Sequence, residues 1–568
     1  MDRRTFIKSL PAVAALSTTL GREAEAATLP DMLNVPDILD VKAVGNWSNY
    51  SGTITRKNIP LFCTPHPATK VLGREVGALQ GQANAVNAIL KYCFANEAPL
   101  RSMGSRWSFS KIIQPKDVIL DTPNLNSMVK IGPRSQTDAY KASRGAQGFV
   151  PYWIMGGTEI SAINRRLLMD FPSTPLCLQT SGAADGQRLA GAIATGTHGS
   201  AIQIGAMHDT VLAIHLLVAP DQAVLIQSGS APALSSTFVE WLQAETGSPI
   251  TLIQDDDLLA TAQVSLGSLG VLFSLVLEAV PAYKLLRHTV KFKDRNDPKL
   301  WAAIKTLESG AFFPNEEAKP YHFEVLFNPY PVAGDPSALL TLMWKKPTGN
   351  APPADADLVP PAVPSDTMSF IGNLVGSLDG KLPSAFLTHE LGIAINDQIK
   401  SMFGHADGTL LYPGQVFGAT DLPKGTGASS EIVIDHADTE RAAHAIWEVF
   451  NEQAKRGKHL LGAMSLRFLP ASKAHLAMNT HAMNCYIELP SIKDPEVLEV
   501  YTAIWNRLEE KDIPFTCHWG QLGGMNPSRM AKYFKGREVK WKTAREKLLD
   551  ATGRKVFATP LLAQLGLE

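Results

Sequence analysis

Residues 191–200 constrain this chain more than any other stretch, because they read Gly-Ala-Ile-Ala-Thr-Gly-Thr-His-Gly-Ser. Glycines lack a Cβ atom and let the backbone approach a bound group closely. Backbone amides with threonine and serine hydroxyls can bind a diphosphate without a lysine. A second glycine-bearing loop, residues 101–108, follows a short predicted strand. The two loops indicate a phosphate-binding site, and the alternative is that each is only a turn.

Other phosphate and metal motifs are not supported. Neither loop has the form G-x-x-x-x-G-K-[ST], and neither is a strand, G-x-G-x-x-G and helix unit with an acidic residue about 20 positions on. This argues against an ATPase and a Rossmann fold. The five cysteines form no C-x-x-C pair, so we expect neither a disulfide scaffold nor a metal site.

Composition excludes several classes of protein. The 568 residues are 45% apolar, and 53 basic residues balance 54 acidic ones to a net charge of −1. A nucleic-acid or acidic-membrane binder needs a basic excess, so we expect neither partner. The length suits several domains or one large two-lobed enzyme.

The N-terminal residues 1–26 have the pattern of an export signal. Arg3 and Arg4 precede a mildly apolar run at 10–20 and an Ala-Glu-Ala cleavage pattern at 24–26. Paired arginines are typical of the twin-arginine route, so we expect transient contact with that machinery and a bacterial periplasmic location. The run is too short for a stable membrane anchor. The alternative is a basic amphipathic helix that stays attached.

Hydrophobic spacing predicts a mixed α+β chain. In the first half, apolar runs at 211–218 and 223–226 flank Pro220-Asp221, which predicts a hairpin, and 271–280 predicts a long strand. A proline-rich stretch, 346–366, predicts a surface loop.

The second half predicts another α+β unit. Strands are expected at 431–434, 461–469 and 485–489. Asp438 is a candidate N-cap for one helix, and Asp494-Pro495 opens another.

Three segments carry a resemblance to a known family. Residues 99–109, 191–200 and 265–271 closely resemble the FAD-binding domain of the vanillyl-alcohol oxidase and p-cresol methylhydroxylase (PCMH) superfamily. The Ala-Thr-Gly-Thr-His-Gly-Ser string is similar to its aldonolactone and alditol oxidase branch, as are 518–520 and 550–557. Segments within 321–347 look like the substrate lobe of type II cholesterol oxidases.

The resemblance implies an α+β, two-lobed fold. A PCMH-type FAD-binding domain is expected at 60–285, a substrate-binding cap at 286–510, and a C-terminal segment at 511–568 that completes the FAD domain. His198 is expected to brace its loop rather than to act as an acid or base. The residues implied for FAD binding are Arg101, Ser102, Met103, Gly104, Ser105, Arg106, Trp107, Ser108, Gly191, Ala194, Thr195, Gly196, Thr197, His198, Gly199, Ser200, Gly267, Gly270 and Val271.

Three departures from the family pattern change the expectations. Many relatives carry a flavin-linking histidine where this chain has Trp107. We therefore expect FAD to be held non-covalently, the alternative being a link from another residue. Relatives carry Glu-x-Arg where this chain has Ser465 and Arg467, and the sugar-oxidising relatives carry a lysine at Gln521.

The chemistry still suggests roles for the residues that are present. Oxidation of an alcohol carbon through flavin needs hydride transfer to N5, loss of the hydroxyl proton and stabilisation of negative charge. Arg467 suits the last task, with a purely structural ion pair as the alternative, and Glu488 is a candidate base with His475, His481 and His518 behind it. Ser465 and Gln521 are candidates for binding the substrate.

These residues predict an FAD-dependent oxidoreductase for a small-molecule alcohol. The substrate is a polyol, a sugar lactone or a sterol-like alcohol, and the acceptor is oxygen or a periplasmic carrier. The alternative is a flavin-bearing protein that binds a ligand without turnover. The oligomeric state stays open.

Overall fold

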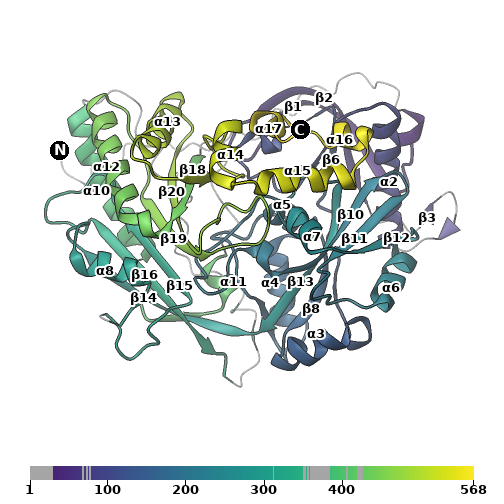
Figure 1. Cartoon of the computed structure of the whole chain (residues 1–568), viewed down its shortest axis with the longest axis horizontal. Coiled ribbons are helices and arrows are strands. Elements are labelled where there is room, and N and C mark those ends of the chain that lie inside the picture. Colours follow the sequence, from purple (N-terminus) through teal and green to yellow (C-terminus); the bar gives the residue numbers. More distant parts are fainter. Residues whose placement is uncertain are drawn as a thin grey trace, which may run out of the picture.

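The computed structural model describes residues 30–66, 70–71, 74–75, 78–114, 116–310, 312–349, 353–354, 357, 384–403, 407–418 and 427–568. The predicted signal, residues 1–26, and most of the proline-rich stretch lie outside these residues. The described chain folds into two α+β lobes that lie side by side (Figure 1).

The first lobe is built on two sheets. A four-stranded sheet has the order β1-β2-β6-β5, and a seven-stranded sheet has the order β12-β11-β10-β13-β8-β7 with β9 paired to β13. The strands are β1 Leu39–Ser48, β2 Thr55–Pro65, β5 Leu100–Met103, β6 Val118–Asp121, β7 Met128–Lys130, β8 Val150–Met155, β9 Leu176–Leu178, β10 Val211–Ala219, β11 Gln222–Gln227, β12 Ile250–Gln254 and β13 Val271–Pro281; a separate pair is β3 Lys70–Val71 and β4 Arg74–Glu75. The helices are α2 Ala78–Ala95, α3 Asp138–Ser143, α4 Ile160–Met169, α5 Leu189–Ala194, α6 Ser236–Thr246 and α7 Asp256–Gln263.

The second lobe is one eight-stranded sheet backed by helices (Figure 1). Its order is β17-β14-β16-β15-β19-β20-β18-β21. The strands are β14 Tyr283–Phe292, β15 His322–Phe327, β16 Ala338–Pro347, β17 Thr409–Leu411, β18 Gly427–Asp435, β19 Met464–Pro470, β20 Met483–Ile492 and β21 Phe515–Cys517; the helices are α8 Pro298–Thr306, α10 Ser384–Phe403, α11 Pro413–Val416, α12 Thr439–Lys455 and α13 Pro495–Glu510.

Four C-terminal helices lie along the top of Figure 1 in yellow; the first packs on β21 of the second lobe, and the other three reach the first lobe. They are α14 Pro527–Phe534, α15 Arg537–Leu548, α16 Ala551–Val556 and α17 Pro560–Leu565. Helix α15 packs on α7, and α16 packs on α2. The buried Trp541 indole donates to the Val264 carbonyl at 3.2 Å, which fixes α15 to the first lobe.

Local sequence signals account for most of these elements. Strands β10 and β11 form the predicted antiparallel hairpin, and Asp221 at its turn has φ of 56°. Asp494 caps α13 through the Glu496 amide, with Pro495 at the first helical position.

Asp438 occupies the predicted N-cap position of α12, but its side chain makes no capping hydrogen bond. Asp435 caps the short turn His436–Asp438 that precedes the helix, by accepting from the Ala437 amide. The carboxylate of Asp438 pairs with Arg441, which lies on the same face one turn later.

Among the described residues, none of the helices combines the length and the apolar character that a bilayer crossing requires.

Candidate active site

A cavity lies where the first-lobe loops meet the eight-stranded sheet. Together with the space open to solvent it measures about 1250 Å³. It extends from the glycine-bearing loops of the first lobe to the polar face of the eight-stranded sheet, an elongated shape that suits an extended cofactor. Of the predicted cofactor residues, Gly104, Ser105, Arg106, Trp107, Ser108, Gly191, Thr195, Thr197 and His198 line it.

The remaining predicted cofactor residues do not line the cavity, and some of them connect the segments that do. The buried Arg101 guanidinium donates to the carbonyls of Leu266 and Gly267, each at 3.3 Å. The Leu266 amide donates to the Ala194 carbonyl at 3.1 Å. The three glycine-bearing segments are thus bonded to one another. The residues that do not line the cavity are Arg101, Ser102, Met103, Ala194, Gly196, Gly199, Ser200, Gly267, Gly270 and Val271.

Two lining glycines play different parts. A Cβ added to Gly104 would come within 2.6 Å of the Arg188 Cβ, so this glycine allows the loop to pack on that arginine. A Cβ added to Gly191 would meet no atom within 4 Å. Gly191 therefore borders open space in which a ligand can reach the backbone.

Two arginines and two buried amide oxygens that lack a hydrogen-bond partner in the described part of the chain line the cavity and indicate which ligand groups it can bind. Arg106 and Arg188 both line the cavity. Burial raises the pKa of Asp121, and the charges of these two arginines oppose that rise, so the positive charges lie near one another. The buried Oε1 atoms of Gln187 and Gln521, which belong to lining residues, have no hydrogen-bond partner among the described residues. Such atoms need a ligand or water. The arginines fit the diphosphate of FAD, and the two amide oxygens, which accept hydrogen bonds, fit N–H groups such as those of its ring system.

An aromatic wall adjoins the first loop. The Trp107 and Tyr50 rings lie 5.4 Å apart, and Phe109 and Ile113 line the same cavity. This wall provides apolar area for a ring system or an apolar substrate.

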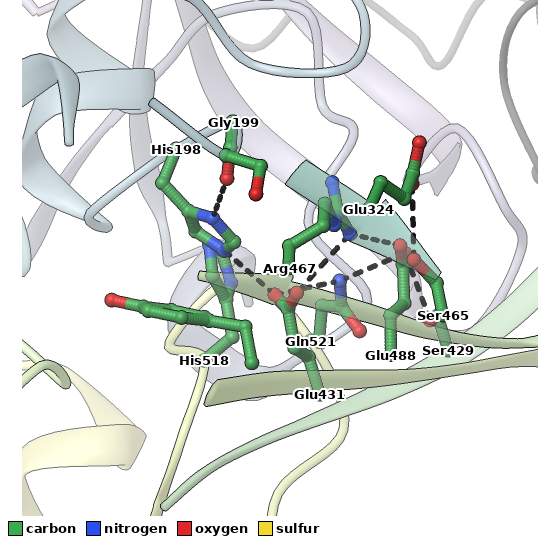
Figure 2. Close-up of polar contacts among 12 residues, drawn as sticks. His198, Gly199, Glu324, Ser429, Glu431, Ser465, Arg467, Glu488, His518 and Gln521 are labelled. Carbon is green, nitrogen blue, oxygen red and sulfur yellow. Dashed lines mark hydrogen bonds and ion pairs between the residues drawn. The ribbon is translucent and has the colours of Figure 1, made fainter. Parts of the chain in front are cut away.

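The opposite wall is a row of polar side chains on the eight-stranded sheet. Cross-strand register places Glu431 opposite Glu488, and Glu488 opposite Ser465. Arg467 is two residues beyond Ser465 and therefore points to the same face. Figure 2 shows these side chains converging with His198, His518 and Gln521.

Arg467 holds the two carboxylates together. Its Nη2 lies 3.1 Å from Glu431 Oε1 and also binds the Glu488 carboxylate. Like charges directly opposite one another destabilise a sheet, and this shared cation offsets that repulsion. Burial raises the pKa of Glu431, but His198 and Arg467 outweigh it and hold that pKa near about 2. Glu431 is therefore ionised.

His518 and Gln521 complete the site. The His518 Nδ1 accepts from the Gly520 amide at 3.0 Å, and burial lowers the pKa of His518 to about 4. The Gln521 amide nitrogen lies 3.3 Å from Glu488 Oε1 and 3.5 Å from Glu431 Oε2. Both residues, together with Arg467 and Glu488, line the cavity.

Three other candidates do not line the cavity. Ser465 donates to Glu324 Oε1 at 3.0 Å and does not line the cavity. His475 contacts Thr261, and His481 pairs with Asp435; neither lines the cavity.

Among the charged lining residues, two were not predicted from the sequence, Glu431 and Arg188. Glu431 is a lone charge inside an otherwise apolar and small-residue strand, which was a usable signal. Arg188 precedes the glycine string by three residues, inside Gly-Gln-Arg. Glu431 supplies a carboxylate to Arg467 from another strand, so the missing Glu-x-Arg acid does not leave the arginine unpaired.

Comparisons with known proteins agree with this architecture. The cholesterol oxidase from B. sterolicum superposes with a TM-score of 0.65 over 95% of this chain and 100% of its own length, at 13% identity. A solvent-stable cholesterol oxidase gives a TM-score of 0.59 at 13% identity, with the same coverage of both chains. This likeness establishes a two-domain α+β fold.

Sequence relatives name the chemistry of their own family. The L-gulono-1,4-lactone dehydrogenase of Mycobacterium tuberculosis H37Rv is 26% identical over 189 residues, 33% of this chain and 34% of the relative. The D-arabinono-1,4-lactone oxidase of Debaryomyces hansenii is 23% identical over 203 residues, 35% of this chain and 30% of the relative. The matches fit the aldonolactone oxidase branch of the PCMH-type flavoenzymes.

The expected family resemblance and α+β fold are therefore confirmed at low identity. The matched region spans about a third of the length of the curated relatives. No family model matches the chain. The relatives are a dehydrogenase and an oxidase, which supports the expectation of an FAD-dependent oxidase or dehydrogenase.

Proposed function

We propose that this protein is an FAD-dependent oxidoreductase that oxidises an alcohol carbon. One observation carries the proposal: a single cavity joins the glycine-bearing loops to the Glu431, Arg467 and Glu488 cluster. The loops suit a cofactor diphosphate, and the cluster suits the transfer and stabilisation of charge.

FAD, when bound, supplies the acceptor for the hydride that leaves the substrate carbon. Loops 101–108 and 191–200 would hold it, with Arg106 and Arg188 near its negative charges. Trp107 would pack beside the ring system without a covalent bond. Acid precipitation tests this: yellow flavin should appear in the supernatant, and colour that stays in the pellet would overturn the non-covalent binding.

Glu488 would accept the proton of the substrate hydroxyl. Its carboxylate is buried, lines the cavity, and faces the Gln521 amide and Arg467. Arg467 would keep both carboxylates in place while charge develops nearby. A general base of this kind typically contributes about 10²–10⁴ in rate.

The wall composition favours a neutral and weakly polar alcohol. Two carboxylates already use Arg467, so that arginine is engaged rather than available to a substrate carboxylate. The aromatic wall at Tyr50 and Trp107 offers apolar area, and Gln521 stands where sugar-oxidising relatives carry a lysine. A sterol-like alcohol therefore fits better than a sugar acid; a sugar lactone or polyol remains the second candidate because the sequence relatives are named for lactones.

Anaerobic mixing tests activity and substrate class together. The purified flavoprotein is mixed with a sterol alcohol, an aldonolactone and a polyol, and absorbance near 450 nm is followed. We expect the sterol alcohol to bleach the flavin fastest. Bleaching by none of a wider alcohol panel would favour the non-catalytic ligand-binding alternative. Reoxidation by air or by added cytochrome then separates an oxidase from a dehydrogenase.

We also propose export through the twin-arginine route, on the basis of Arg3 and Arg4. Replacing both by lysine should retain the protein in the cytoplasm, as fractionation would reveal. Unchanged periplasmic recovery would overturn the proposal.

A further inference from the structure

His198 sits between two oxygen atoms in the wall of the cavity. Its Nδ1 lies 2.9 Å from the Gly199 carbonyl oxygen, and its Nε2 lies 3.0 Å from Glu431 Oε2 (Figure 2). A carbonyl oxygen only accepts, so Nδ1 must carry a hydrogen. The second contact also requires a hydrogen, either on Nε2 or on the glutamate.

Burial makes this requirement strict. The side chains of His198 and Glu431 are 2% and 1% exposed, respectively. Two lone pairs facing each other at 3.0 Å without water or a proton would be strongly unfavourable in such surroundings. The other carboxylate oxygen of Glu431 accepts from the Arg467 guanidinium at 3.1 Å, a contact that an ionised carboxylate makes, so the hydrogen is assigned to His198.

The charges nearby point the same way. Glu431 and Glu488 provide two negative charges, and Arg467 provides one positive charge. An uncompensated buried charge is costly. A positive His198 reduces the net negative charge of the buried acids, which include Glu324 near Arg467.

The other groups around the pair do not supply that charge. His518 offers Nδ1 as an acceptor to the Gly520 amide and is neutral, and Tyr486, whose ring lies 3.9 Å from that of His198, has its pKa raised by burial. Burial lowers the pKa of His208 as well. The amide of Gln521 is uncharged.

A metal ion is a poorer explanation of the same cluster. Single ligand atoms of His198, Glu431 and His518 lie within 4.8 Å of one another. The neutral His518 uses the lone pair of Nδ1 for Gly520 and therefore carries its hydrogen on Nε2. It has no ring nitrogen left to donate to a metal.

We propose that His198 and Glu431 form a buried positioning pair that retains one proton at neutral pH and reduces the excess negative charge beside the flavin. The role toward flavin rests on the proposed function. The pair fixes Glu431 against Arg467 and leaves Glu488 as the carboxylate that exchanges protons with the substrate.

Flavin midpoint potentials test this assignment without any substrate. If the proton is present, His198→Gln removes one positive charge and lowers the potential, because nearby negative charge disfavours electron uptake. Glu431→Gln alone should leave the potential near that of the unchanged protein, since His198 then releases its proton. The double variant should restore the potential lost in His198→Gln.

The opposite pattern would overturn the proposal. If His198 is neutral, His198→Gln leaves the potential unchanged and Glu431→Gln raises it. Dye-coupled reductive titration measures all four proteins, whether or not an alcohol reduces them, so failure of the proposed substrate chemistry is a separate result.

A second measurement reads the proton directly. With ¹⁵N-histidine labelling, both ring nitrogens of His198 should have imidazolium shifts at pH 7.5, with the signal assigned by its loss in His198→Gln. Glu431→Gln should convert them to one protonated and one bare nitrogen. A bare nitrogen in the unchanged protein would refute the pair even if a variant fails to fold. The more exposed His481 and Asp435 pair, also at 3.0 Å, supplies a comparison signal from a histidine and carboxylate outside the cavity.

Discussion

The two large sheets bury acidic side chains in opposite ways. On β13 of the seven-stranded sheet, Glu278 accepts from Tyr140, Arg144 and Gln179, so one carboxylate has one arginine and two neutral donors. On the eight-stranded sheet, Glu431 and Glu488 share a single arginine. The carboxylates of both sheets are buried and ion-paired. Only on the eight-stranded sheet do carboxylates outnumber the arginine they share, and only there do they lie beside the cavity.

Two buried histidines, His215 and His198, differ in their surroundings in the same way. His215 on β10 is fully buried, and Ser274 is its hydrogen-bond partner. Burial lowers the pKa of His215 to about 3. His198 has similar burial but faces a carboxylate. The two histidines are therefore distinguished by their hydrogen-bond partners, a serine for His215 and a carboxylate for His198, and not by how deeply they are buried.

Removal of the arginines should give the largest difference between the sheets. Arg467→Met leaves two buried carboxylates opposite each other, and breaking a buried pair costs about 3–5 kcal/mol. In Arg144→Met, Glu278 keeps the donors Tyr140 and Gln179, and water can reach the place of the half-exposed Arg144 side chain. The loss in the free energy of unfolding should therefore be smaller. Chemical unfolding of both variants measures this, and equal losses would contradict the comparison.

Neutralising the acids should separate chemistry from structure. Glu488→Gln should slow anaerobic flavin reduction by about 100-fold or more, as expected for loss of a general base. Glu278→Gln, in the first lobe, should leave that rate within a factor of about two. Similar slowing in both would remove Glu488 from its proposed role.

The pH dependence of the free energy of unfolding should reveal the buried histidines His518 and His215. A folded-state pKa of about 4 for His518, below the ordinary 6.5, means that the unfolded state binds its proton first. Stability is therefore full above pH 6.5 and falls as pH drops toward 4; for His215 the fall continues toward 3. Each histidine contributes to the slope between pH 6.5 and its own folded-state pKa, so His518→Gln and His215→Gln should each reduce the slope between pH 6.5 and 4.5 by a similar amount. Urea midpoints from pH 7.5 to 4.5 provide the measurement, and unchanged slopes would contradict the burial argument.

The smallest expected effect concerns open space at two glycines. Gly191 and Gly132 both have nothing within 4 Å of an added Cβ, but only Gly191 lines the cavity. Gly191→Ala should weaken FAD binding several-fold, and Gly132→Ala should not. Both should change the stability of the flavin-free protein by no more than about 0.5 kcal/mol. Fluorescence titration with FAD decides whether the wall at Gly191 meets the cofactor.

Local signals in the sequence predicted much of this architecture. The hairpin at Asp221 and the proline start of α13 follow from turn and cap preferences that act over a few residues. The glycine-rich segment 191–200 was also recognisable from its local composition, and several of its residues line the cavity.

Pairings between distant strands were not predictable in this way. Nothing within a few residues of Glu431 indicates that it lies opposite Glu488 and against His198, because sheet register brings together residues far apart in sequence. The short turn His436–Asp438 shows the same limit on a small scale, because the sequence indicated the start of α12 at Asp438 but not the separate turn that Asp435 caps before it.

A consequence for biosynthesis follows from the contact between the first loop and the segment after β21. The Phe109 amide donates to the Gly520 carbonyl at 2.7 Å, and the Ser110 hydroxyl binds the Trp519 carbonyl at 2.5 Å. A nascent chain therefore holds its first glycine loop for more than four hundred residues of translation before the partner emerges. The wall of the cavity beside Phe109 is therefore complete only after residues 519–520 have been synthesised and have folded back onto the first lobe.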